Sequence, residues 1–138
     1  MRVKYILSTV ALTVLAGAAY AGLVQPAPVT VDLANRTALG DQLTARRADN
    51  DIELIGCGIR IFDDQSGPFE FGFCQATDSA GVVAFCFTQS PALLESMRST
   101  SAYAFITFAW NENDECIRIG FSTQSFYLPD PDIKHKGK

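Results

Sequence analysis

The sequence contains four cysteines, which could bind a metal ion or form disulfides. They are Cys57, Cys74, Cys86 and Cys116. Four thiolates can hold a zinc ion, but no two of these cysteines have the C-x-x-C spacing of a zinc knuckle. An even number of cysteines in a small exported domain instead predicts two disulfides, with three possible pairings. We therefore expect no metal at these cysteines.

Acid–base groups are sparse. The single histidine, His135, lies in the polar tail at 130–138, where no neighbouring side chain is expected to orient it for catalysis. Two carboxylates can cleave a glycosidic bond without a histidine, so Glu70 and Glu112 keep a polysaccharide hydrolase as an alternative. The acidic clusters at 63–64 and 112–115 fall where turns are expected, which favours solvated side chains. We expect no catalytic residues.

Cofactor motifs are missing from the sequence as well. No glycine-rich phosphate loop or dinucleotide fingerprint occurs. The run NENDE at 111–115 has oxygen ligands that calcium prefers, but it lacks the spacing of a calcium-binding loop. We predict neither a cofactor nor a metal.

Residues 1–21 have the composition of a secretory signal peptide. Two basic residues precede an apolar run at 6–19, and Ala19-Tyr20-Ala21 fits cleavage after Ala21. The run is shorter than the roughly 20 residues that a membrane-spanning helix needs. We therefore expect a secreted or periplasmic protein with no transmembrane segment after signal cleavage.

The charge of the remaining chain argues against one class of partner. Cleavage removes Arg2 and Lys4, which leaves nine Lys and Arg against 15 Asp and Glu and moves the formal net charge from −4 to −6. An acidic domain repels a phosphate backbone, so we do not expect nucleic-acid binding.

The stretch FCQATDSAGVVAFC at 73–86 predicts a β-hairpin. Gly81 can adopt a positive φ and close a turn that begins at Asp78, which places Cys74 opposite Cys86. We therefore predict a Cys74–Cys86 disulfide and, by elimination, a Cys57–Cys116 disulfide. The alternation of side chains predicts one face of small residues and one of large residues, which we expect to form the core. The large residues are Phe69, Phe71, Phe73, Val83, Phe85 and Phe87.

The other elements predict a mainly β domain. We expect an extended or loosely ordered segment at 22–50, with a first strand at 29–33, and a disulfide-stabilised β domain at 51–129. Ser90 and Pro91 predict a short helix at 90–98. A strand at 101–110 should reverse so that Trp110 faces Cys116 and Phe108 faces Arg118. The predicted fold is a small antiparallel sandwich, or a helix-covered antiparallel sheet, of five to seven strands.

The last third of the chain supplies a candidate binding surface. Its aromatic and polar side chains suit a protein or a glycan partner. The candidate residues are Tyr103, Trp110, Arg118, Phe126 and Tyr127. We therefore expect an exported, non-catalytic binding module, with an inhibitor and an envelope or matrix component as the two roles considered. The alternatives are the carboxylate-dependent hydrolase and a self-assembling structural subunit that pairs through exposed strand edges.

Overall fold

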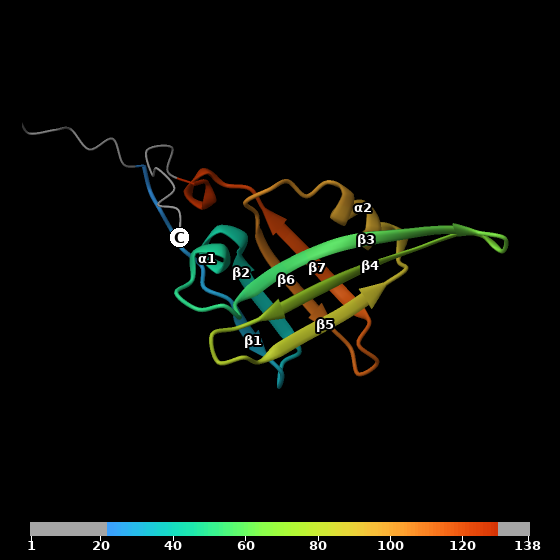
Figure 1. Cartoon of the computed structure of the whole chain (residues 1–138), viewed down its shortest axis with the longest axis horizontal. Helices are drawn as coiled ribbons and strands as arrows, with labels where there is room; N and C mark the ends of the chain where they lie inside the picture. Colours follow the sequence, from blue (N-terminus) through green and yellow to red (C-terminus); the bar gives the residue numbers. More distant parts are fainter. Residues whose placement is uncertain (1–21, 130–138) are drawn as a thin grey trace, which may run out of the picture.

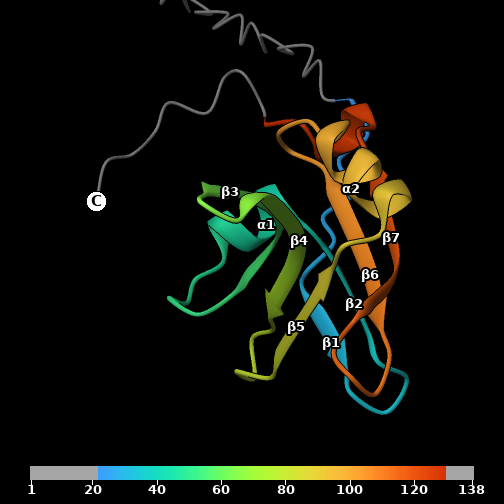
Figure 2. The same cartoon turned by 90° about the vertical axis from the view of Figure 1, so that its right-hand side faces the viewer.

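Seven strands form two antiparallel sheets that pack face to face (Figures 1 and 2). The computed structural model describes residues 22–129, so the predicted signal peptide and the tail with His135 lie outside the described residues. One sheet has the order β1-β2-β6-β7, with bounds Thr30–Asp32, Thr37–Asp41, Phe105–Trp110 and Cys116–Ser122. The other has the order β3-β4-β5, with bounds Leu54–Asp64, Gly67–Thr77 and Val83–Thr88. The predicted mainly β fold is confirmed.

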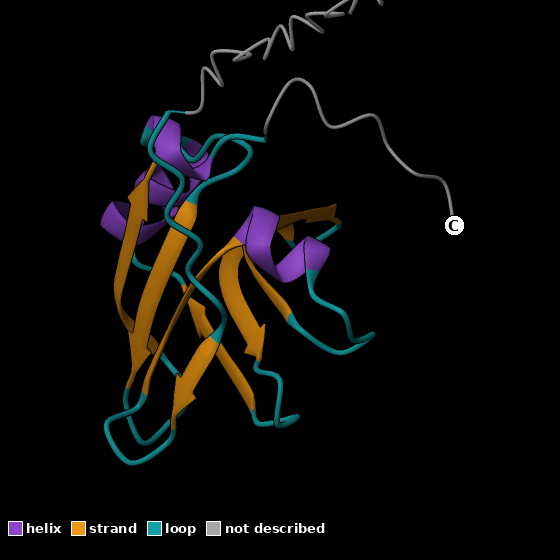
Figure 3. Ribbon diagram, turned by 90° about the vertical axis from the view of Figure 1, so that its left-hand side faces the viewer, coloured by secondary structure: helices purple, strands orange, loops and turns teal. Residues whose placement is uncertain are grey.

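Three short helical segments lie at the ends of the sheets (Figure 3). These are α1 at Gln42–Arg47, α2 at Pro91–Arg98 and a 3-10 turn, η1, at Ser125–Tyr127. Helix α2 confirms the helix predicted at 90–98, with Pro91 in its first turn. Within residues 22–129 no helix has the length and apolar character that crossing a bilayer requires.

The segment at 22–50 differs from the loosely ordered segment that we expected. It supplies β1, β2 and α1, and β2 pairs directly with β6 in the four-stranded sheet. Apart from Val29, its buried residues are small or polar, so the spacing of the leucines did not indicate them. Gly40 illustrates this, since a Cβ built on it would lie 3.0 Å from Cα of Val29. The absence of a side chain at Gly40 lets Val29, which precedes β1, pack closely on β2.

The β3–β4 hairpin sets a cysteine pairing that we predicted wrongly. Asp64 pairs with Gly67 across a tight turn in which Gly67 has φ 99°, and the same register places Cys57 opposite Cys74. Cys57 and Cys74 form one disulfide, with their Cα atoms 4.0 Å apart. Cys86 is then free to pair with Cys116 of β7, and this second disulfide joins the two sheets. All four cysteines are oxidised as predicted, but the Cys74–Cys86 and Cys57–Cys116 pairings are wrong.

The β4–β5 hairpin has the predicted register. Cys74 faces Cys86, and Phe73 faces Phe87. The turn is closed by Asp78, whose Oδ1 accepts hydrogen bonds from the backbone N–H groups of Ala80 and Val82, both at 3.0 Å. Gly81 has the expected positive φ, 80°. Turn chemistry therefore determines this hairpin.

The prediction of which hairpin face forms the core is wrong. The small side chains of β4 and β5 point into the protein, and the phenylalanines point outward. Gly72 explains part of this, because a Cβ there would lie 2.4 Å from Sδ of Met97 on α2. The Cys86–Cys116 disulfide also requires the cysteine face to point toward β7. A face of small residues allows the closest approach of the opposing sheet and helix.

The β6–β7 hairpin contains a bulge that shifts its register. Trp110 faces Cys116 as predicted, but the bulge between Ala109 and Trp110 places Ala109 opposite Arg118 and Phe108 opposite Ile119. The predicted pairing of Phe108 with Arg118 is therefore wrong, because the bulge adds one residue to β7. As a result, Phe108 lies in the core while Arg118 is exposed.

Candidate functional site

The structure does not bring the five predicted binding residues into one surface. Trp110 is buried, with its ring centroid 5.8 Å from that of Phe108. Tyr127 is buried in the η1 turn and stacks on Phe105, at 5.5 Å between ring centroids, and meets the edge of Phe126. Tyr103 and Arg118 are exposed, in the loop before β6 and on β7 respectively. Trp110 therefore belongs to the core, and Tyr127 and Phe126 pack against each other beside Phe105 of the four-stranded sheet.

The candidate carboxylates take part in ion pairs and turns. Glu70 accepts a hydrogen bond from the guanidinium of Arg98, which ties α2 to β4. Glu112 pairs with Arg36 at 3.0 Å. In the turn at 111–115, the Asn111 side chain accepts hydrogen bonds from two backbone N–H groups and donates one to Glu115. The Glu115 contacts organise a surface turn, while the pairs of Glu70 and Glu112 join separate elements, so these carboxylates have structural partners.

The strongest candidate site is the outer face of the three-stranded sheet, which we call the phenylalanine face. Strand alternation places these side chains together on the side of the sheet that points away from the core. Four of its phenylalanines are between 41% and 53% exposed. The face consists of Phe62, Phe69, Phe71, Phe73, Val83, Phe85 and Phe87.

The rings of this face form a continuous array. Phe71 lies about midway, with its centroid 6.1 Å from Phe62, 6.0 Å from Phe69 and 6.4 Å from Phe73. Phe73 continues the array to Phe85 on β5, at 6.2 Å. These separations are in the range in which aromatic rings attract one another. The rings therefore support one another even though water reaches them.

Two features give the phenylalanine face its shape. The Arg60 guanidinium lies over the Phe73 ring, with Cζ 4.8 Å from the centroid, and supplies a positive charge at the β3 side. A groove of about 370 Å³ lies between the rings of β4 and β5 and is lined by Phe69, Phe71, Phe85, Phe87 and Gln89. The face thus offers both flat aromatic surface and a shallow apolar groove.

The phenylalanine face continues onto a projecting arm, which we define as residues 58–71. Strand β5 pairs only with residues 72–77 of β4, so this part of the β3–β4 hairpin has no third strand. Figure 1 shows the arm extending past the rest of the fold. Ile61, on the opposite side of the arm from Phe62, is 66% exposed. Apolar side chains are therefore open to solvent on both sides of the arm.

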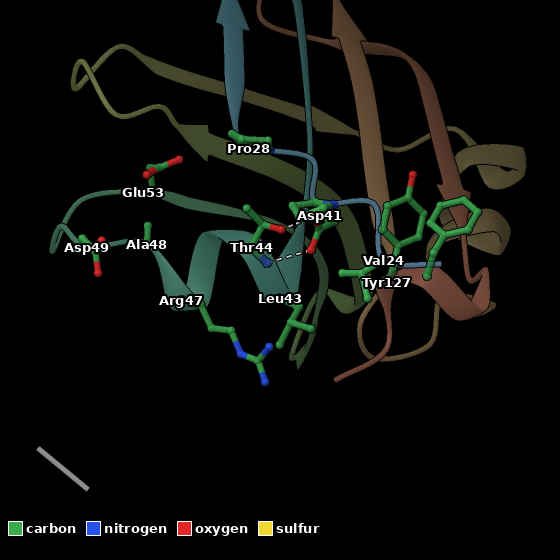
Figure 4. A pocket seen from close by; sticks show the side chains of 12 residues that line it. Val24, Pro28, Asp41, Leu43, Thr44, Arg47, Ala48, Asp49, Glu53 and Tyr127 are labelled. Atoms are coloured by element: carbon green, nitrogen blue, oxygen red, sulfur yellow. Dashed lines mark hydrogen bonds between the residues drawn. The ribbon is translucent and has the colours of Figure 1, made fainter. Parts of the chain in front are cut away.

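A second hollow lies beside α1 and η1 (Figure 4). It has a volume of about 380 Å³ and includes Val24, Asp41, Thr44 and Tyr127 in its lining. Asp41 is buried and its oxygens already accept hydrogen bonds from Ala27 and Thr44. Burial, and then the charge of Asp41, raise the pKa of Tyr127 above its ordinary value of 10.0. Because the buried carboxylate has its partners within the chain, its role here is structural.

The sulfur atoms of three cysteines gather in the core. The Sγ atoms of Cys74, Cys86 and Cys116 lie within 4.8 Å of one another. All three belong to disulfides, so they have no thiolate to offer a metal ion. This cluster is a product of the two adjacent disulfides.

The fold and site define a small two-sheet β domain with two disulfides and an exposed aromatic face. Comparison with protein families, curated proteins and solved structures finds no match for this chain. Sequence reasoning did find the spacing of the phenylalanines but assigned them to the core. The missing signal was the Asp64–Gly67 turn, which pairs Cys57 with Cys74 and leaves Cys86 to point toward the other sheet.

Proposed function

We propose that this chain is an exported, non-catalytic binding module that holds a protein partner on its phenylalanine face. The observation that carries the proposal is the exposure of Phe62, Phe69, Phe85 and Phe87, which lies between 41% and 53%. With roughly 200 Å² of surface for each phenylalanine, these four alone expose on the order of 400 Å². Contiguous apolar patches of this size commonly mark an interaction site.

The chemistry of the face favours a protein over a glycan. Phenyl rings carry no hydroxyl or N–H group, whereas a sugar presents hydroxyl groups that need hydrogen-bond partners. Apolar side chains of a protein partner make no such demand, and the groove between β4 and β5 suits their insertion. Arg60 adds one charged contact at the rim.

Export is supported by the disulfides and by the composition of residues 1–21. Two disulfides in a domain of this size are typical of oxidising compartments. The ion pairs of Glu70 and Glu112 and the turn contact of Glu115 support a non-catalytic role, since these carboxylates already have partners within the fold.

Affinity capture with two matched variants tests the proposal. The oxidised protein is immobilised and exposed to envelope and secreted fractions, and the retained proteins and polysaccharides are identified. Phe85→Ser combined with Phe87→Ser should abolish retention of the partner, because both rings line the groove. Ile117→Ser is the control, since Ile117 is 62% exposed on β7, in the other sheet.

Three outcomes are informative. Retention of one protein by the wild type and by Ile117→Ser, but not by the double variant, supports the proposal. Retention of a polysaccharide alone would overturn the choice of a protein partner. Equal retention by all three forms would overturn the assignment to the phenylalanine face.

A further inference from the structure

We propose that a second copy of this chain binds along the outer edge of the arm, with the two β3 strands antiparallel. The pairing joins two three-stranded sheets into one continuous sheet and places both phenylalanine faces on the same side. It goes beyond the proposed function, because the partner here is the chain itself and the contact is a strand edge.

The backbone groups on the outer edge of β3 can be identified from its pairing with β4. The Cα atoms of Cys57 and Cys74 are only 4.0 Å apart, which marks a pair that does not exchange backbone hydrogen bonds. Ile59, Ile61 and Asp63 follow at steps of two, so their N–H and C=O groups point away from β4. The Ile59 carbonyl shows this directly, because it accepts a hydrogen bond from the Arg60 guanidinium at 3.3 Å.

The outer edge of β3 is better suited to pairing with another strand than the outer edges of β4 and β5. Helices α1 and α2 both contact β3, while the turn end of the arm extends past the rest of the fold (Figure 1). The opposite edge of the arm contains Pro68, which has no N–H to donate, and Glu70, which is paired with Arg98. Farther along, β5 is tied to the β7 side by the hydrogen bond from Phe87 N to Asp114 O, 3.0 Å long. No proline interrupts β3.

The charges of the arm complement those of a second copy in one register. When Phe62 faces Phe62 of the second copy, Arg60 faces the second copy's Asp64, and the two-fold axis repeats this contact. Within residues 22–129, Arg60 makes no ion pair. Its guanidinium lies over Phe73 and donates one hydrogen bond to the Ile59 carbonyl, and its remaining N–H donors can bind a carboxylate. Shifting the strands so that Arg60 faces Arg60 is disfavoured, because like charges directly opposite repel. The charges of Arg60 and Asp64 therefore favour the register in which Phe62 faces Phe62.

The same register satisfies the outer backbone groups. Ile61 then faces Asp63 of the second copy, and both residues direct their backbone groups outward. Such a pair exchanges two N–H to C=O hydrogen bonds across an antiparallel interface. The side chains of Phe62, 53% exposed in the single chain, meet across the two-fold axis, and Ile61 lies beside Asp63 of the second copy.

Sedimentation equilibrium of the oxidised protein tests the pairing. The wild type should approach twice its monomer mass as concentration rises. Arg60→Asp and Asp64→Arg should each weaken the dimer by about tenfold or more, and combining them should restore it, because the opposite charges again face each other. A wild type that stays monomeric at millimolar concentration would overturn the proposal, as would single variants that dimerise like the wild type.

A proline on the edge separates this pairing from the proposed function. Ile61→Pro removes an N–H that points away from β4, so the fold should persist while the dimer is lost. Ile61→Thr is the matched control, because it keeps the N–H and should still dimerise. If Ile61→Pro remains monomeric but still captures the partner of the phenylalanine face, the two surfaces act independently. Pairing through β3 would be contradicted if an Ile61→Pro variant were folded and dimerised like the wild type.

Discussion

Replacing both Cys86 and Cys116 with alanine should lower the free energy of unfolding by about 3.5 kcal/mol. The two cysteines are separated by 30 positions, and their disulfide joins β5 to β7 across the core. Its loss frees the unfolded chain and removes the covalent link between the two sheets. Urea unfolding of the oxidised double variant and the wild type measures the difference.

A single substitution tests the pairing behind this prediction. Cys86→Ala releases one thiol, which the structure places at Cys116. Alkylation of the unfolded, unreduced variant followed by mass spectrometry identifies the labelled residue. Labelling at Cys74 would contradict the Cys86–Cys116 disulfide and support the Cys74–Cys86 pairing.

Asp41→Ala should destabilise the protein by roughly 3 kcal/mol, because it leaves buried donors without an acceptor. Asp41 is 1% exposed and ends β2. Its carboxylate accepts hydrogen bonds from Ala27 N at 2.6 Å, Thr44 N at 2.7 Å and Thr44 Oγ1 at 2.5 Å. It thus caps α1 and holds the N-terminal segment against β2 (Figure 4).

Asp49→Ala is the control for this prediction. Asp49 is exposed beyond the end of α1, so its loss should change the free energy of unfolding by no more than about 0.5 kcal/mol. Thermal and urea unfolding of both variants give the comparison. If Asp41→Ala costs no more than Asp49→Ala, Asp41 does not hold these segments together.

Local turn and cap residues made parts of this fold predictable. Gly81 and Asp78 determine the β4–β5 register through a positive φ and side-chain hydrogen bonds to the backbone. Pro91 lies in the first turn of α2, while Ser90 occupies the N-cap position without a side-chain capping hydrogen bond. Such signals act over a few residues, so they can be read without knowing the tertiary structure.

The disulfide pairing could not be predicted from the β4–β5 turn alone. Cys74 has a cysteine opposite it on each side, Cys57 on β3 and Cys86 on β5. The β4–β5 turn alone favours Cys86. The Asp64–Gly67 turn brings Cys57 equally into register, and the choice between the two depends on Cys116, which lies in the other sheet. Long-range packing therefore determines a pairing that local reasoning leaves open.

The orientation of the three-stranded sheet could not be predicted from hydrophobicity. Phenylalanine is usually buried, so its alternation with small residues suggested that the phenylalanines form the core. In the structure Gly72 and the cysteines permit the close approach of α2 and β7, and that packing excludes large side chains. A conflict between local pattern and burial is expected at functional surfaces. The same conflict explains why the phenylalanines were correctly predicted to share one face of the sheet, but that face was wrongly predicted to form the core.

The outward position of the phenylalanine face can be tested by comparing the unfolding free energy of Phe85→Ala with that of Phe108→Ala. Phe85 is 47% exposed on the phenylalanine face, whereas Phe108 is 0% exposed in the core. We predict a loss of about 1 kcal/mol for Phe85→Ala, mainly from its contact with Phe73, and about 3 to 5 kcal/mol for Phe108→Ala. Equal losses of 3 kcal/mol or more would show that Phe85 lies in the core and would contradict the exposed phenylalanine face.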